Sequence, residues 1–250
     1  MPVWGTFPDR TSGAGWSGPK RIVQPHAPPP DTELSRMDES KQQAWDEYWA
    51  RARPPLGARP GGFTRWASDI LLGHSVRRVV DLGCGPGRDL CFLVTRGFEV
   101  RGVDSSSVAV GMAETAIAGL PPHLAARASV ECLTASELLE RIPPGSIDGV
   151  HATVLYETID EARLPTLFAL VRAALRPGGL HVWSARIFRQ GAERADAAIP
   201  PNRPENIVVH HRPFTLSLAD DLSRPGFVRI ASASSRDGAN LYVADQRPVD

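Results

Sequence analysis

The chain has 250 residues, 42% of them hydrophobic and 22% charged, which fits one globular domain with appendages. Its 28 basic residues balance its 28 acidic residues. Proteins that bind nucleic acid independently of sequence normally carry a basic excess, so we expect no nucleic-acid partner. No run of the chain approaches the roughly 18 apolar residues of a membrane span, and the N-terminus lacks the apolar core of a signal peptide. We expect a cytoplasmic protein with no membrane partner.

Three cysteines, Cys84, Cys91 and Cys132, lie in apolar segments. Their number is odd and none are spaced as C-x-x-C, so we predict buried free thiols in a reducing compartment.

Residues 1–35 are rich in proline, glycine and small polar residues and show neither a helical nor an alternating period. Such a segment buries too little apolar surface to offset its ordering entropy. We predict a flexible tail, followed by one domain over residues 36–250.

A helix is predicted over residues 37–52, which Pro54 and Pro55 would end. Trp45 and Trp49 are four residues apart, so both indoles share one helical face, with Tyr48 beside them. This aromatic face packs on the sheet as core or covers a ligand, and the sequence leaves both interpretations open. A second helix is predicted over residues 63–72.

Short apolar runs then alternate with helical runs. The predicted strands are 78–82, 99–103, 129–133, 147–152 and 180–185, and the helices between them are 88–96, 106–118, 136–141 and 162–175. This alternation predicts a parallel sheet covered by helices on both faces. It stops after residue 186, and a helix over 216–223 and strands over 227–234 and 240–244 follow. Asp237 and Gly238 between the two strands predict a hairpin, and hence an antiparallel end to the sheet.

The segment VVDLGCGPGR, residues 79–88, is typical of a strand, a glycine turn and a helix start. Glycines let a ligand approach the backbone, and the helix N-terminus offers unpaired N–H groups. The spacing is G-x-G-x-G and not the G-x-G-x-x-G of a dinucleotide-binding fold. Asp81 precedes the glycines and suits a cationic ligand, such as S-adenosylmethionine with its ammonium and sulfonium groups, better than a pyrophosphate.

Asp104 ends the next strand, 21 residues after Gly83. An acid at this place can accept hydrogen bonds from both ribose hydroxyls of a nucleoside. Asp81 and Asp104 can also be ordinary strand-end carboxylates that cap the following helices. Their combination with the glycine turn favours ligand binding.

The stretches VVDLGCGPGRD and VRGVDSS resemble the first two motifs of the class I S-adenosylmethionine-dependent methyltransferase family. PPGSIDGV, residues 143–150, and LRPGGL, residues 175–180, resemble its fourth strand and its turn into the fifth. The resemblance implies an α/β, Rossmann-like fold: a mostly parallel seven-stranded sheet with helices on both faces and an antiparallel last strand. It also implies S-adenosyl-L-methionine as the cofactor.

The resemblance implies cofactor contacts at matching positions. Those of the methionine half are Asp81, Gly83, Cys84, Gly85, Gly87, Ala152 and Thr153; those of the ribose and adenine are Asp104, Ser105, Thr134 and Ala135. The acid usual near the adenine edge is missing from residues 133–136, so Thr134 or Ser136 would substitute.

The acceptor should lie near residues that follow the fourth strand and near the N-terminal helices. The candidate general bases are His151, Tyr156, His210 and His211, and the candidate substrate contacts are Trp45, Tyr48, Trp49 and Glu157. His151 can equally be a packed strand residue, and the His210–His211 pair an ordinary polar loop. We expect no metal site, because no third ligand stands at a recognisable spacing. By resemblance, residues 36–76 form a helical lid and residues 186–213 a substrate-side insertion.

The predicted function is methyl transfer from S-adenosylmethionine to an oxygen, nitrogen or sulfur of a small molecule. The alternatives are a non-catalytic S-adenosylmethionine-binding module that regulates a partner, and methylation of a protein side chain. A nucleotide-dependent oxidoreductase is disfavoured by the glycine spacing. The sequence does not indicate the oligomeric state.

Overall fold

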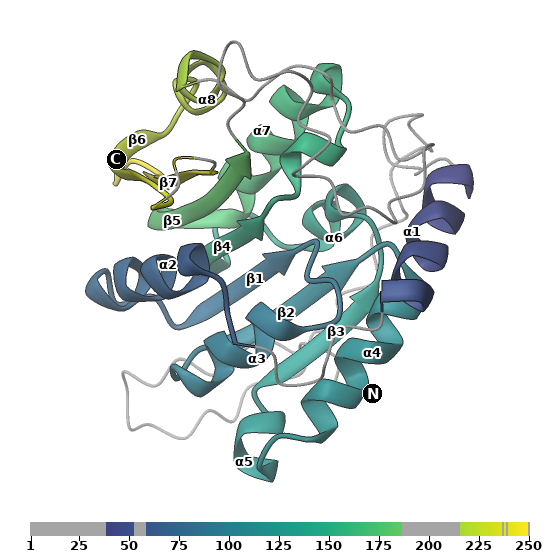
Figure 1. Cartoon of the computed structure of the whole chain (residues 1–250). Helices are drawn as coiled ribbons and strands as arrows, with labels where there is room; N and C mark the ends of the chain where they lie inside the picture. Colours follow the sequence, from purple (N-terminus) through teal and green to yellow (C-terminus); the bar gives the residue numbers. More distant parts are fainter. Residues whose placement is uncertain (1–38, 53–58, 187–215, 237, 239, 250) are drawn as a thin grey trace, which may run out of the picture. The chain divides into compact units, whose positions relative to one another are not determined.

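The computed structural model describes residues 39–52, 59–186 and 216–249, except 237 and 239 (Figure 1). The described residues belong to one unit of the chain, Glu33–Asp250. The tail predicted for residues 1–35, and all of the predicted insertion except Arg186, lie outside the described residues.

Seven strands form one sheet in the order β3-β2-β1-β4-β5-β7-β6. Their bounds are β1 Arg78–Leu82, β2 Glu99–Asp104, β3 Ala128–Cys132, β4 Ile147–Thr153, β5 Leu175–Arg186, β6 Val228–Ser234 and β7 Asn240–Gln246. The first five strands pair in parallel, and β7 runs antiparallel to both β5 and β6. The mostly parallel sheet with an antiparallel last strand is therefore confirmed, as is the hairpin that joins β6 to β7.

Helices cover both faces of the sheet, as predicted (Figure 1). Their bounds are α1 Glu39–Ala52, α2 Gly62–Gly73, α3 Arg88–Thr95, α4 Ser107–Ala118, α5 Pro122–Ala125, α6 Ala135–Arg141, α7 Leu164–Ala174 and α8 Leu216–Ser223. One buried apolar cluster joins the strands to α2 and α3, and another joins them to α6, α7 and α8. The central strands β1 and β4 are buried almost throughout, because both faces are covered.

Three short elements were not predicted: the one-turn helix α5 and the 3₁₀ turns η1, Tyr156–Thr158, and η2, Glu161–Arg163. The 3₁₀ turn η2 occupies the predicted start of α7, because the Asp160 carboxylate accepts a bond from the Ala162 N–H at 3.0 Å and caps this turn. Strand β5 begins five residues before its predicted start. Leu175 already pairs with Ile147, and the chain then bulges through Gly178, at φ 73°, before Leu180 pairs with Gly149.

The Asp148 carboxylate connects the amino ends of β1, β4 and β5 by hydrogen bonds. It accepts hydrogen bonds from the backbone N–H groups of Arg77 and Arg78, at 3.1 and 2.9 Å, and from Nε of Arg176 at 2.9 Å. This acid, which the sequence places at the start of the fourth strand, is therefore structural and lies at the opposite end of the strands from the glycine turn.

The prediction of three buried thiols is wrong for two of them. Cys84 is buried, but Cys91 is half-buried and Cys132, the last residue of β3, is exposed. An apolar sequence context does not bury a residue at the end of an edge strand. Within the described part of the chain, no helix has the length and apolar character needed to cross a membrane.

Candidate cofactor-binding site

A cavity of about 1000 Å³ lies where the carboxyl ends of the central parallel strands meet the glycine turn. This is the edge at which open parallel sheets bind ligands, and the volume suits a nucleoside-sized molecule together with a small partner. Most of the predicted contact residues line it: Trp45, Tyr48, Trp49, Gly83, Cys84, Gly85, Gly87, Asp104, Ser105, Thr134, Ala135 and Thr153.

The glycine turn needs glycine for two reasons. Gly85 has φ 53°, and a Cβ added there would lie 3.1 Å from the Trp49 ring, so a side chain would occupy the space between α1 and the turn. Gly87, at φ 80°, caps α3, and its Cβ would lie 3.0 Å from Ala113 of α4. The turn thus exposes bare backbone to the cavity, as a cofactor that approaches the main chain requires.

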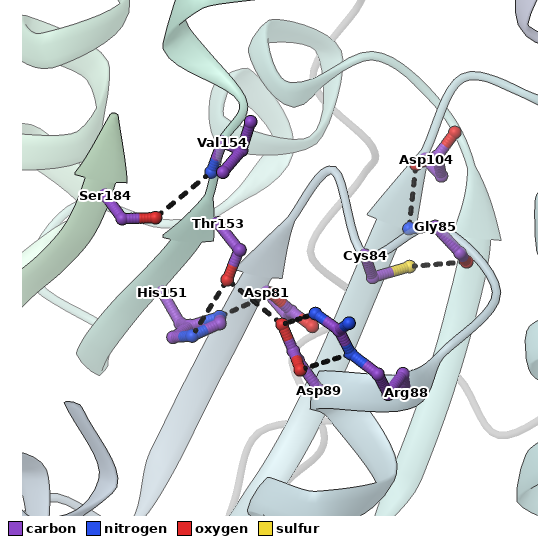
Figure 2. A network of polar contacts seen from close by, with 10 residues as sticks. All are labelled: Asp81, Cys84, Gly85, Arg88, Asp89, Asp104, His151, Thr153, Val154 and Ser184. Atoms are coloured by element: carbon purple, nitrogen blue, oxygen red, sulfur yellow. Dashed lines mark hydrogen bonds and ion pairs between the residues drawn. The ribbon is translucent and has the colours of Figure 1, made fainter. Parts of the chain in front are cut away.

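Asp104 is held at the end of β2 by two backbone groups. Its Oδ2 accepts a hydrogen bond from the Gly85 N–H at 2.9 Å (Figure 2). Its Oδ1 accepts one from the Ser106 N–H, also at 2.9 Å. Burial raises the pKa of this carboxyl to about 6, although the two N–H groups oppose the shift. Each carboxylate oxygen has further lone pairs for a ligand, so the ionised group can accept two more hydrogen bonds, as the vicinal hydroxyls of a ribose require.

Asp81 and His151 form a buried pair beneath the cavity. They are paired residues of the neighbouring strands β1 and β4, and the His151 Nδ1 lies 2.7 Å from the Asp81 Oδ1 (Figure 2). His151 is 0% exposed and Asp81 2%, and the Phe63 ring stacks on the imidazole with the centroids 5.2 Å apart. Burial lowers the pKa of His151, but the Asp81 charge and hydrogen bond outweigh it and raise the pKa overall.

Neither member of this pair lines the cavity. Asp81 was the expected contact of the methionine half, and His151 was either a candidate base or a packed strand residue; the structure places both groups under the floor of the cavity. Ala152, another predicted contact, is also fully buried between its neighbours. The Asp81 Oδ2 is buried without a hydrogen-bond partner among the described residues.

Arg88, Asp89 and Thr153 form a polar wall of the cavity (Figure 2). Asp89 accepts hydrogen bonds from Nε and Nη2 of Arg88, at 2.9 and 3.1 Å, and from the Thr153 hydroxyl at 3.1 Å. Burial raises the pKa of Asp89, but the hydrogen bonds from Arg88 and the charge of the nearby His151 lower it by more, so the pKa is lowered overall. This ionised group ties the start of α3 to the end of β4. Arg88 and Asp89 were not among the predicted contacts, although both directly follow the last glycine of the turn.

The loop after β4 faces the cavity with residues other than those predicted. Tyr156 is fully buried, with its hydroxyl 2.6 Å from Nε2 of His181, and burial raises the Tyr156 pKa well above its ordinary value. Glu157 is buried too and accepts a hydrogen bond from the Arg186 N–H at 3.2 Å. Both residues anchor the loop, because the 3₁₀ turn η1 directs them inward.

Of the residues after β4 that do line the cavity, only Arg186 was predicted, as the first residue of the substrate-side insertion. These residues are Val154, Leu155, Thr158, Ile159, Asp160, Arg163, Leu167 and Arg186. Val154 has φ 54°, a strained value for a β-branched residue, and its N–H donates to Oγ and O of Ser184 at 3.3 and 3.2 Å (Figure 2). The remaining candidate bases, His210 and His211, lie outside the described residues.

Known proteins share this sequence pattern and fold. Residues 79–179 match the family described as a methyltransferase domain. A ubiquinone biosynthesis O-methyltransferase from Alkalilimnicola ehrlichii is 27% identical over 61% of this chain and 71% of its own length. Hemagglutinin 1 from Eikenella corrodens is 33% identical over 42% of this chain, which spans a third (33%) of that relative's length.

A solved structure extends the similarity to the whole fold. The 1,6-didemethyltoxoflavin-N1-methyltransferase of Burkholderia thailandensis superimposes with a TM-score of 0.61 and 21% identity, covering 83% of this chain and 87% of that one. The matched residues include the glycine turn and the acid at the end of β2, and they lie in the sheet whose strand order is given above. Residues 79–179 thus match a methyltransferase-domain family, and the fold of the described chain is that of a solved S-adenosylmethionine-dependent methyltransferase.

Proposed function

We propose that the chain transfers a methyl group from S-adenosylmethionine to an oxygen, nitrogen or sulfur of a small molecule. The observation that carries the proposal is the Asp104 carboxylate, fixed by the backbone N–H groups of Gly85 and Ser106 at the edge of the cavity. It offers paired acceptors for ribose hydroxyls beside a turn in which Gly83, Gly85 and Gly87 carry no side chain.

We assign the parts of the donor to residues as follows. Asp104 holds the ribose, and Ser105 and Ala135 lie beside the adenine. The Thr134 hydroxyl caps α6 by accepting a bond from the Glu137 N–H at 3.2 Å, so it helps to shape the adenine pocket. Gly83, Cys84, Gly85 and Thr153 surround the methionine half, and the Asp89 carboxylate beside Thr153 suits its ammonium. Asp81 and Ala152 support this wall from beneath.

When bound, S-adenosylmethionine supplies an electrophilic methyl group on its sulfonium. The contribution of the chain is to align the acceptor with this group and to exclude water. The apolar side chains of the remaining wall are Trp45 and Tyr48 of α1 and Leu155, Ile159 and Leu167 after β4, and the charged Asp160, Arg163 and Arg186 line it too. Such a wall favours a small aromatic or otherwise apolar acceptor. No histidine of the described residues lines the cavity, so we assign general-base catalysis to none of them.

Two relatives support a small-molecule acceptor. One is named for ubiquinone biosynthesis, and the other is named for N-methylation of didemethyltoxoflavin. The charge balance of the chain adds to this support, since it does not favour a polyanionic acceptor.

Calorimetry and turnover test the proposal in sequence. Purified protein is titrated with S-adenosylhomocysteine and separately with NAD; we expect only the first to bind. The protein is then incubated with S-adenosylmethionine and panels of phenols, nitrogen heterocycles and thiols, and formation of S-adenosylhomocysteine is measured. Asp104→Ala should lose binding, whereas Asp69→Ala, at an exposed ion pair with Arg96, should retain it. Absence of S-adenosylhomocysteine binding refutes the proposal. Binding without turnover on any panel would favour a non-catalytic module.

A further inference from the structure

Helix α1 packs against α4 (Figure 1), and the carboxylate of Asp46 bonds it to the start of that helix. The Asp46 Oδ1 accepts a hydrogen bond from the Ser106 hydroxyl at 2.6 Å and one from the Val108 N–H at 3.2 Å. The Ser107 hydroxyl lies 3.4 Å from both carboxylate oxygens. A negative charge at this place also interacts favourably with the N-terminal end of the α4 dipole.

Ser106 connects this attachment to the ribose carboxylate. Its side chain is fully buried, caps α4 by accepting from the Ala109 N–H at 3.1 Å, and donates to Asp46. Its own N–H donates to Oδ1 of Asp104. A single buried residue therefore bonds to both α1 and the group to which we assign the ribose.

Helix α1 also carries the aromatic wall of the cavity. Trp45, Tyr48 and Trp49 all line it, and their rings pack on one another, with 4.8 Å between the centroids of Tyr48 and Trp49. The Trp49 ring lies over Gly85, the residue that donates its N–H to Asp104. The position of α1 thus determines how closely this wall approaches the donor site.

We propose that Asp46 is a positioning residue that holds α1 over the donor site through Ser106, and so couples closure of the aromatic wall to ribose binding at Asp104. This role rests on the proposed donor site. A ligand that orders Asp104 also orders Ser106 and strengthens the bond to Asp46. By linkage, holding α1 in place increases affinity for that ligand by the same factor.

The experiment compares Asp46→Ala with Glu47→Ala. Glu47 is the next residue of the same helix, carries the same charge and pairs with Arg51 at 3.0 Å on the exposed side, so its removal leaves the attachment to α4 intact. Association and dissociation of S-adenosylhomocysteine are followed by tryptophan fluorescence in a stopped-flow instrument. Hydrogen exchange of residues 41–52 is measured with and without this ligand.

We expect Asp46→Ala to release S-adenosylhomocysteine about tenfold faster, with little change in the association rate. Its α1 amides should exchange faster in both states, whereas Glu47→Ala should match the wild type. Asp46→Asn keeps an acceptor for the Ser106 hydroxyl but lacks the charge, so it should release the ligand faster than the wild type and more slowly than Asp46→Ala. An intermediate rate would not follow from a general loss of packing.

Unchanged release and exchange in Asp46→Ala overturn the inference, while wild-type binding leaves the proposed function standing. Failure of the wild type to bind S-adenosylhomocysteine refutes the proposed function, and with it the coupling. Hydrogen exchange of the α1 amides in ligand-free wild type and Asp46→Ala then shows separately whether Asp46 holds the helix.

Discussion

Acidification from pH 7 to pH 5 should weaken binding of S-adenosylhomocysteine by protonating Asp104. The folded-state pKa of this carboxyl is raised to about 6 by burial, so its proton competes with the ligand just below neutral pH. The ribose hydroxyls need an ionised acceptor, and a protonated carboxyl offers fewer lone pairs. If only the ionised form binds, the dissociation constant exceeds that of the fully ionised protein by a factor of 1 plus 10 to the power (pKa − pH). With a pKa of about 6, this factor is about 11 at pH 5 and about 1.1 at pH 7.

Calorimetric titrations at pH 5, 6 and 7 and constant ionic strength measure this dependence. The amino and carboxyl groups of the ligand stay ionised across this range, since their ordinary pKa values are about 8 and about 3.5. Asp104→Asn should bind weakly, with a loss of about 1.5–3 kcal/mol, and its affinity should not vary with pH. Asp69→Asn, which removes an exposed carboxylate, should keep the wild-type dependence. A wild-type affinity that is constant between pH 5 and 7, or an equal slope in Asp104→Asn, would refute the ribose assignment.

Three further substitutions test the surroundings of the site. His151→Ala leaves the buried Asp81 without its partner and should reduce the free energy of unfolding by about 3–5 kcal/mol in urea denaturation; a loss below about 1 kcal/mol would contradict a charged pair. Val154→Gly relieves the positive φ of a β-branched residue and should raise stability by about 1 kcal/mol, measured by thermal melting; a lower melting temperature would argue against strain there. Trp49→Ala should weaken S-adenosylhomocysteine binding at least fivefold and reduce stability by less than about 2 kcal/mol, because the ring lines the cavity. A large loss of stability with little change in binding would assign this aromatic face to the core.

The strands and the glycine turn could be predicted because their signals are local. Continuous apolar runs indicate buried parallel strands, and the spacing of Gly83, Gly85 and Gly87 indicates a backbone that a ligand approaches. The place of Asp104 on the cavity wall was predictable for the same reason, since a strand in a parallel sheet delivers its last residue to the ligand-binding edge.

The orientation of the side chains around the site could not be predicted in this way. Asp81 and His151 are 70 positions apart, and only the register of β1 against β4 makes them partners. Tyr156 and Glu157 look accessible in a loop, but the unpredicted turn η1 directs them into the core. Asp46 stands in the sequence as an ordinary helix-surface acid, because the groups it binds belong to α4.

The sheet order determines when, during synthesis, the proposed donor site can form. β1 is made before every other strand, yet one of its neighbours, β4, is synthesised about seventy positions later, after β2 and β3. Until then Asp81 and one edge of β1 lack their partners, although the glycine turn is already present. Pairing between such distant segments is entropically costly and slow compared with local contacts. A nascent chain that ends before β4 therefore carries the glycine turn of the proposed donor site without the Thr153 wall beside it, and we expect ligand binding only once the sheet is complete.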